Sequence, residues 1–232
     1  MTVSTMIPAL LLAGLSVGAL AESAAAQSLA ANPSLAADPP VAAETPLQRF
    51  SGPPEHPRRH YRVADPATLA PAEAQAIYDR LRPDLARRYA AGGDASAGSY
   101  QSWRKFNSAP YSSMTHGRRF VNNYANEAAE AYGEAEGAGQ LPVGAIVAKD
   151  SFVVTKAGEI RPGPLFLMEK MPAGFNYVTG DWRYSMVTAG GELAGRTGGP
   201  GAERVEFCIS CHLAQEAQDH LFFVPLDLRP RS

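Results

Sequence analysis

The spacing of hydrophobic residues changes at about residue 65. Residues 27–64 are rich in Ala and Pro and follow neither a helical nor a strand period, so we predict a disordered linker there. Beyond it, hydrophobic residues recur at near-helical spacing at Ile77, Leu81, Leu85 and Tyr89. This spacing predicts a helix, or a pair of helices divided at Pro83, over residues 71–91, ended by Gly92 and Gly93.

Farther along the chain, the pattern is that of extended segments. Runs with the composition of β-strands cover residues 120–125, 143–154, 165–171 and 182–187. Between the first two runs, Asn126 is a favourable N-cap for a short helix that ends at Gly133 or Gly137. These elements predict an α+β fold, with a curved antiparallel β-sheet and flanking helices in one domain over residues 65–232.

Glycines are concentrated in residues 190–204. A phosphate-binding loop would continue into Gly-Lys-Ser/Thr, and this segment does not. We therefore predict a flexible surface loop there.

The N-terminus has the pattern of an export signal. An apolar stretch at residues 6–20 is followed by the small-x-small motifs Ala19-Leu20-Ala21 and Ala24-Ala25-Ala26. This predicts a signal peptide over residues 1–26 and a periplasmic location. No Lys or Arg precedes the apolar stretch, so an uncleaved anchor is the alternative.

Composition narrows the possible partners. The hydrophobic content of 45% is enough for one domain with a core. The chain has 21 basic and 23 acidic residues, and loss of the signal peptide would remove only Glu22, which leaves 21 against 22. This balance of charges does not indicate the basic surface patch that nucleic-acid binding needs.

The strongest chemical motif is Cys208-Ile209-Ser210-Cys211-His212, which contains the only two cysteines of the chain. This is the C-x-x-C-H pattern of c-type haem attachment, in which each thiol adds to a haem vinyl group. His212 would then be the proximal ligand of the iron. The motif therefore predicts one covalently attached haem, held by Cys208 and Cys211.

A cysteine pair with this spacing has three other possible uses. A thioredoxin-like dithiol is expected near a βαβ pattern, whereas this pair lies near the C-terminus after a glycine-rich segment. A structural zinc site needs two further ligands, and a simple disulfide is the remaining possibility.

An ordered series of motifs resembles the family of cytochrome P-460 and cytochrome c′-β over about residues 100–229. Apart from the haem motif, the matching segments are Tyr100-Gln101-Ser102-Trp103, His116-Gly117-Arg118-Arg119 leading into Asn126, residues 142–150, Leu167-Met168-Glu169 and Gly180-Asp181-Trp182. The resemblance implies a β-rich periplasmic protein with a single haem, a homodimeric assembly and an open distal haem face.

The resemblance also assigns a role to Lys149. By position it is similar to the lysine that, in the P-460 branch, is joined covalently to the porphyrin edge. Strand alternation independently places Val143, Ala145, Val147 and Lys149 on one face, so this lysine continues an apolar face. The alternative is a lysine at a strand end that extends into solvent.

Glu169 matches the distal carboxylate of the P-460 branch, which implies a general base. Alternation places Glu169 with Leu165, Leu167 and Met171, so we expect it beside the haem if that face is interior. The alternative is a strand-edge glutamate paired with an arginine.

The distal side also departs from the family pattern. Val121 stands where the family has its distal arginine. A sixth iron ligand would come from His116, Met114, Met168, Met171 or Met186, although methionines are mostly core residues.

The leading functional expectation is a haem enzyme that oxidises hydroxylamine or a related small nitrogen species and passes electrons to a soluble acceptor such as another cytochrome. Glu169 would remove protons, and a Lys149 cross-link would tune the haem. One alternative is a cytochrome c′-β-like protein that binds nitric oxide or carbon monoxide without turnover. Another is a low-spin electron-transfer cytochrome with His116 or a methionine as sixth ligand.

Overall fold

The computed structural model describes residues 59–230. The predicted signal peptide (1–26) and residues 27–58 of the predicted linker lie outside the described residues. Within residues 59–230, none of the helices has the length and apolar character needed to cross a membrane.

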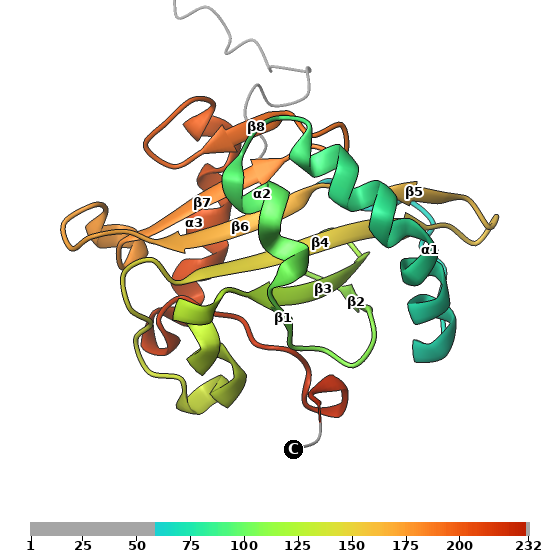
Figure 1. Ribbon diagram of the computed structural model, residues 1–232, viewed down its shortest axis with the longest axis horizontal. Coiled ribbons are helices and arrows are strands. Elements are labelled where there is room, and N and C mark those ends of the chain that lie inside the picture. The colour runs from blue at the N-terminus through green and yellow to red at the C-terminus, as the bar shows by residue number, and fades with distance from the viewer. Residues whose placement is uncertain (1–58, 231–232) are drawn as a thin grey trace, which may run out of the picture. The chain divides into compact units, whose positions relative to one another are not determined.

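An open, antiparallel sheet of eight strands forms the centre of the domain (Figure 1). The strands are β1 (Arg104–Lys105), β2 (Tyr111–Ser113), β3 (Arg119–Ala125), β4 (Ile146–Val154), β5 (Ile160–Pro162), β6 (Leu165–Lys170), β7 (Trp182–Val187) and β8 (Leu193–Arg196). Their order is β1-β3-β4-β6-β7-β8, with β2 paired to β3 and β5 paired to β4. The antiparallel α+β fold expected from the sequence is therefore confirmed.

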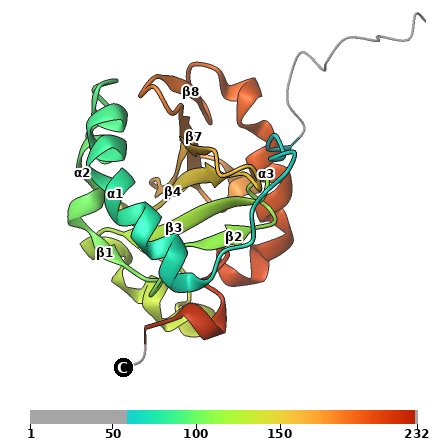
Figure 2. The ribbon, with the colours of Figure 1, turned by 90° about the vertical axis from the view of Figure 1, so that its right-hand side faces the viewer.

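Helices cover both faces of this sheet. The α-helices are α1 (Pro71–Ala90), α2 (Ala95–Ser99) and α3 (Glu206–His212). The 3-10 helices are η1 (Tyr100–Ser102), η2 (Glu127–Gly137), η3 (Tyr177–Thr179), η4 (Ala202–Arg204), η5 (Leu213–Gln218) and η6 (Leu226–Leu228). Figure 2 shows α1 and α2 on one side of the sheet and α3 on the other.

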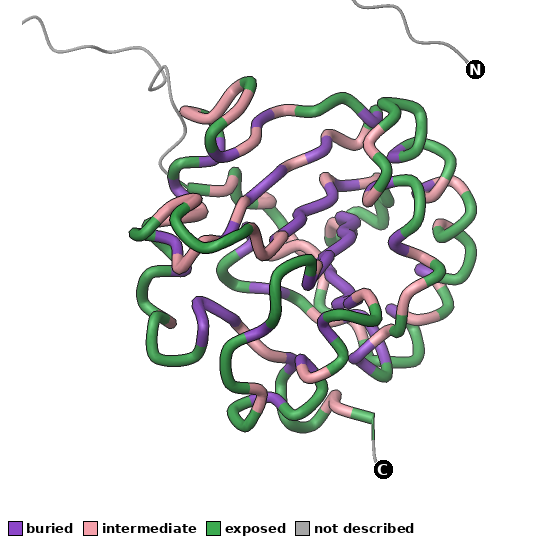
Figure 3. The backbone as a smooth tube through the Cα atoms, turned by 60° about the vertical axis from the view of Figure 1, so that its left-hand side comes forward, coloured by how far each residue is buried: buried purple, intermediate pink, exposed green. Residues whose placement is uncertain are grey.

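Two hydrophobic clusters follow from this layering, because successive side chains of a strand point to opposite faces. On the α1 side, Tyr78 and Leu85 pack against Ala148, Phe152 and other residues of the central strands. The second cluster includes Val147, Met168, Trp182 and Tyr184, with Cys208 of α3 packed against it. Both faces of the sheet are therefore buried, and Figure 3 shows buried residues along its strands.

Of the two arrangements expected at Pro83, the single helix is confirmed, because α1 continues through this residue. Two other expectations about single elements need correction. The segment after Asn126 is a kinked 3-10 helix, although Asn126 does cap it by accepting a hydrogen bond from the Ala129 N–H. The glycine-rich segment contains strand β8, which pairs with β7 and is not simply a loop.

Residues 59–64 are also ordered against the domain, whereas we expected linker there. The Val63 N–H donates to the Gly117 carbonyl over 2.9 Å. The Arg119 guanidinium donates to the Tyr61 carbonyl over 2.7 Å. We call residues 59–69 the N-terminal strap. Farther along it, the Ala67 N–H donates to the Val154 carbonyl over 2.8 Å.

Candidate functional site

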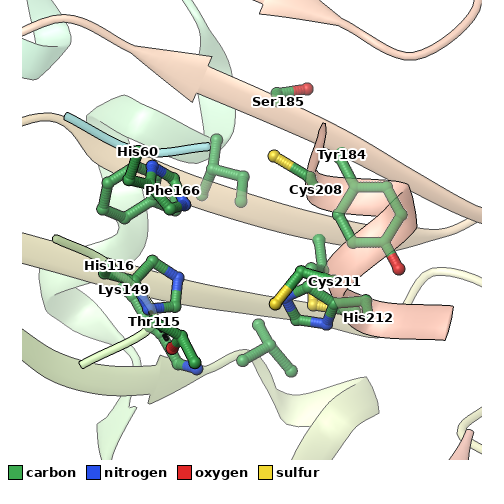
Figure 4. A pocket seen from close by; sticks show the side chains of 13 residues that line it. His60, Thr115, His116, Lys149, Phe166, Tyr184, Ser185, Cys208, Cys211 and His212 are labelled. Carbon is green, nitrogen blue, oxygen red and sulfur yellow. Dashed lines mark hydrogen bonds between the residues drawn. The ribbon is translucent and has the colours of Figure 1, made fainter. Parts of the chain in front are cut away.

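Helix α3 brings the haem-attachment motif to one pocket. Cys208 and Cys211 are three residues apart on this helix, so they lie on one helical face. Both line the pocket together with His212, which follows directly. Figure 4 shows the two thiols and the imidazole on the same side of the pocket.

The ring of His212 is oriented by a hydrogen bond to the backbone. Its Nδ1 lies 2.7 Å from the carbonyl oxygen of His220, so Nδ1–H donates and Nε2 keeps its lone pair. Burial, with a further contribution from Lys149, lowers the pKa of His212 to about 3. The ring is therefore neutral at physiological pH, the form in which an imidazole binds a metal.

The two cysteines are free thiols in the structure. Burial raises the pKa of Cys208 to about 12. Cys211 is more exposed as a residue, but partial burial of its thiol raises its pKa as well. A redox dithiol needs a cysteine with a lowered pKa, because the thiolate is the reactive species. The electrostatics of this pair therefore do not favour thioredoxin-like chemistry.

Lys149 lies in the same pocket as the two cysteines and His212. It belongs to β4, whose alternation separates it from the α1-side residues Ala148 and Asp150. Only 8% of Lys149 is exposed, and its Nζ lies 6.0 Å from the centre of the Phe222 ring. Burial lowers the pKa of Lys149 to about 8, an effect that Cys211 partly opposes. Part of the Lys149 population is therefore a neutral, nucleophilic amine near physiological pH.

Two histidines line the pocket with Lys149, on the side away from the cysteines (Figure 4). The centre of the His60 ring lies 4.9 Å from the ring centre of His116, 4.7 Å from that of Phe166 and 4.6 Å from that of Phe207. Burial is the main cause that lowers the pKa of His60 to about 4 and the pKa of His116 well below its usual value. This wall therefore presents two neutral imidazoles.

His116 is also held through Nδ1. This atom lies 2.9 Å from the Ser113 hydroxyl and 3.2 Å from the Thr115 hydroxyl, each of which can donate to it or accept from it. When Nδ1–H donates, Nε2 keeps its lone pair, as in His212. His60 is the functional candidate that we missed in the sequence, because it lies in a segment without periodicity.

Glu169 does not join this site, which corrects the position we expected for it. It lies on the face of β6 shared with Leu165 and Leu167, and those residues pack in the α1-side cluster. Its carboxylate pairs with the Arg183 guanidinium, and 29% of its side chain is exposed. It does not line the pocket. The alternative of an arginine-paired glutamate describes its observed environment.

The four methionines named as possible sixth iron ligands lie in different environments. Met168 lines the pocket, whereas Met186 lines a neighbouring cavity. Met114 is 62% exposed, and Met171 lines neither cavity. Val121, at the position of the family's distal arginine, is fully buried.

The pocket fits a haem in several respects. Its lining includes the apolar side chains of Val147 and Phe166, as in most cofactor sites. The buried hydroxyl of Tyr184, another lining residue, has no hydrogen-bond partner among residues 59–230. Two thiols and a neutral imidazole with a free Nε2 are the donor set that a c-type haem needs.

Comparison with known protein families gives a match. A family model described as Cytochrome P460 matches residues 97–223, more than half of the 232 residues. The matched range contains His116, Lys149 and the cysteine motif, but His60 and the rest of the N-terminal strap precede it. No curated protein matches the chain.

Proposed function

The chain belongs to the cytochrome P460 family, and from that membership we propose that it is a periplasmic haem enzyme which oxidises hydroxylamine or a related small nitrogen species. Membership itself implies a haem cofactor. The observation that carries the finer proposal is the position of Lys149, which lines one pocket with Cys208, Cys211 and His212.

The two cysteines would hold the haem. Each S–H bond would add across one vinyl double bond, so two thioethers would form without net oxidation or reduction. Nε2 of His212 would bind the iron, while the His220 carbonyl holds Nδ1–H. When bound, the haem supplies an iron that binds the substrate nitrogen and accepts its electrons.

Lys149 would form a further bond to a carbon at the porphyrin edge. The new N–C bond would replace one N–H and one C–H bond and release two protons and two electrons. Hydrogen peroxide would take up the two protons and the two electrons and become two waters. The neutral amine fraction of Lys149 supplies the nucleophile.

The imidazoles of His60 and His116 would hold the substrate by hydrogen bonds, because both line the pocket on the side away from the cysteines. Oxidation of hydroxylamine to nitric oxide releases three protons and three electrons, and the electrons pass to a soluble acceptor such as another cytochrome. The lowered pKa values of the two imidazoles make them poor bases, so the protons leave to solvent and do not stay on the histidines.

An optical spectrum tests this proposal directly, because a lysine bond to the porphyrin edge breaks its conjugation. Protein made in a cytochrome-c-maturing host should stain for haem on a denaturing gel and show a strongly red-shifted Soret band when ferrous. Lys149→Met should restore an ordinary c-type spectrum. Lys156→Met, which removes an exposed lysine, is the matched control. Identical, ordinary spectra for all three proteins would contradict the cross-link.

A second candidate function is a low-spin electron-transfer cytochrome, which is favoured by the free Nε2 of His116. In that case His116 binds the iron opposite His212. The ferric spectrum would be low-spin and would not change with cyanide or nitric oxide. A five-coordinate haem that binds nitric oxide without oxidising hydroxylamine would instead indicate a cytochrome c′-β-like gas-binding protein.

A further inference from the structure

The turn after η5 has an uncommon backbone conformation. Asp219 and His220 have φ angles of 53° and 61°, so two successive residues with side chains are left-handed. This conformation is unfavourable for residues with a Cβ atom, so surrounding contacts must hold it. This turn directs the His220 carbonyl toward Nδ1 of His212. Contacts that hold this turn in place therefore also orient His212, the predicted proximal ligand.

A buried ion pair holds the first residue of the turn. One oxygen of the Asp219 carboxylate lies 2.5 Å from Nζ of Lys170, and the other accepts a hydrogen bond of 2.9 Å from the Leu141 N–H. The Lys170 and Asp219 side chains are only 12% and 3% exposed. Breaking a pair this deeply buried leaves an uncompensated charge.

Trp182 completes the support. Its Nε1–H donates to the Asp219 carbonyl over 2.8 Å, and the centre of its ring lies 4.9 Å from Nζ of Lys170. Lys170 and Trp182 are directly opposite in the β6–β7 register. On the other side of the turn, Gly180 lies so close to the His220 ring that a Cβ there would be 2.8 Å from it.

We infer that Lys170, Asp219 and Trp182 form a positioning network for the proximal histidine, acting through the His220 carbonyl. This inference rests on the proposed attachment of haem at His212, but not on the Lys149 cross-link or on the substrate. None of the three residues needs to touch the haem. Their effect passes through backbone geometry to a single hydrogen bond.

The network has a chemical consequence at the iron. A carbonyl that accepts the Nδ1–H bond makes Nε2 of the imidazole a stronger electron donor. Stronger axial donation favours ferric over ferrous iron and lowers the reduction potential. Loss of the network should therefore raise the potential and weaken the bond between iron and His212.

Two variants of the haem-loaded protein test the inference. Asp219→Asn removes the charge, yet asparagine adopts the left-handed conformation readily and can still accept from Leu141. Lys170→Met removes the other charge. We expect both variants to keep covalent haem, shift the midpoint potential upward and lower the iron–histidine stretching frequency in ferrous resonance Raman spectra. Lys170→Arg should restore the values of the unmodified protein.

The control is Lys156→Met, which breaks an exposed ion pair with Asp65 and should change neither quantity. If Lys170→Met does not fold, Asp219→Asn still decides the question. Haem-loaded variants with unchanged potential and stretching frequency would overturn the positioning network while leaving the proposed function intact. Unmodified protein without covalent haem would instead overturn the attachment at His212, and the network's role with it.

Discussion

Lys149 and Asp150 are neighbours in the sequence but serve opposite faces of the sheet. Lys149 lines the pocket with the cysteine motif. Asp150 is fully buried on the α1 side, where it accepts hydrogen bonds from the hydroxyls of Tyr78 and Tyr100 and from the Asn122 amide. One strand therefore carries a candidate reactive amine and a structural carboxylate at adjacent positions, with the two side chains on opposite faces of the sheet.

The first prediction concerns the pH dependence of the Lys149 cross-link. Burial lowers the pKa of Lys149 to about 8, so its amine loses its proton as pH rises through that value. We expect the yield of red-shifted protein to rise between pH 6.5 and 9 when haem-attached, uncross-linked protein is treated with peroxide. Lys149→Arg should give no product at any pH, because its guanidinium stays protonated. A yield independent of pH would contradict the amine as nucleophile.

The second prediction concerns the stability supplied by the Asp150 cluster. Tyr78→Phe removes a hydrogen bond of 2.6 Å to a fully buried carboxylate. The free energy of unfolding should fall by about 1–3 kcal/mol, since a buried acceptor loses a donor. Urea unfolding measures this change. Tyr61→Phe, at an exposed tyrosine, should have little effect.

The third prediction follows from the same carboxylate. Burial raises the pKa of Asp150, so the folded protein binds its proton more tightly than the unfolded chain does. The contribution of Asp150 to stability should therefore be greatest below the ordinary pKa of aspartate and decline as pH rises toward the raised value. Asp150→Asn should flatten this slope in urea titrations across pH 3–7. An unchanged slope would show that Asp150 ionises alike in both states.

The sequence pattern predicted which residues of a strand share a face, but not which face receives α3. Period-two alternation separated Lys149 from Asp150 and placed Glu169 with Leu165, as the structure confirms. The sheet is buried on both sides, so both faces are apolar and the pattern does not distinguish them. The family resemblance, together with this apolar face, therefore led us to expect Glu169 beside the haem.

The fourth prediction tests this corrected position of Glu169. Glu169→Gln should leave hydroxylamine turnover within about twofold of the unmodified protein, because its side chain pairs with Arg183 away from the pocket. Stability should change by less than about 1 kcal/mol, the usual contribution of a partly exposed ion pair. A fall in turnover of about 100-fold, typical of a lost general base, would restore Glu169 to the mechanism.

The N-terminal strap shows a different limit of sequence reasoning. The lack of a helical or strand period correctly indicated the absence of regular helix or strand over residues 59–64, but it says nothing of tertiary contacts. His60 reaches the pocket through backbone hydrogen bonds of Tyr61 and Val63 with residues far along the chain. The cysteine motif needed no such contacts, because local spacing alone defines it.

The last prediction concerns ligand binding by this strap histidine. His60 lines both the haem pocket and a neighbouring cavity bordered by Arg59, Arg119 and Thr188, so it stands between the two. Its neutral imidazole can donate one hydrogen bond to a ligand on the iron. His60→Ala should therefore speed the release of nitric oxide or cyanide by roughly tenfold, the factor that about 1.4 kcal/mol gives. Stopped-flow displacement measures the rate, and Arg62→Ala, at an exposed strap residue, is the control. Equal release rates in all three proteins would mean that His60 makes no bond to the ligand, and the distal side would then depend on His116.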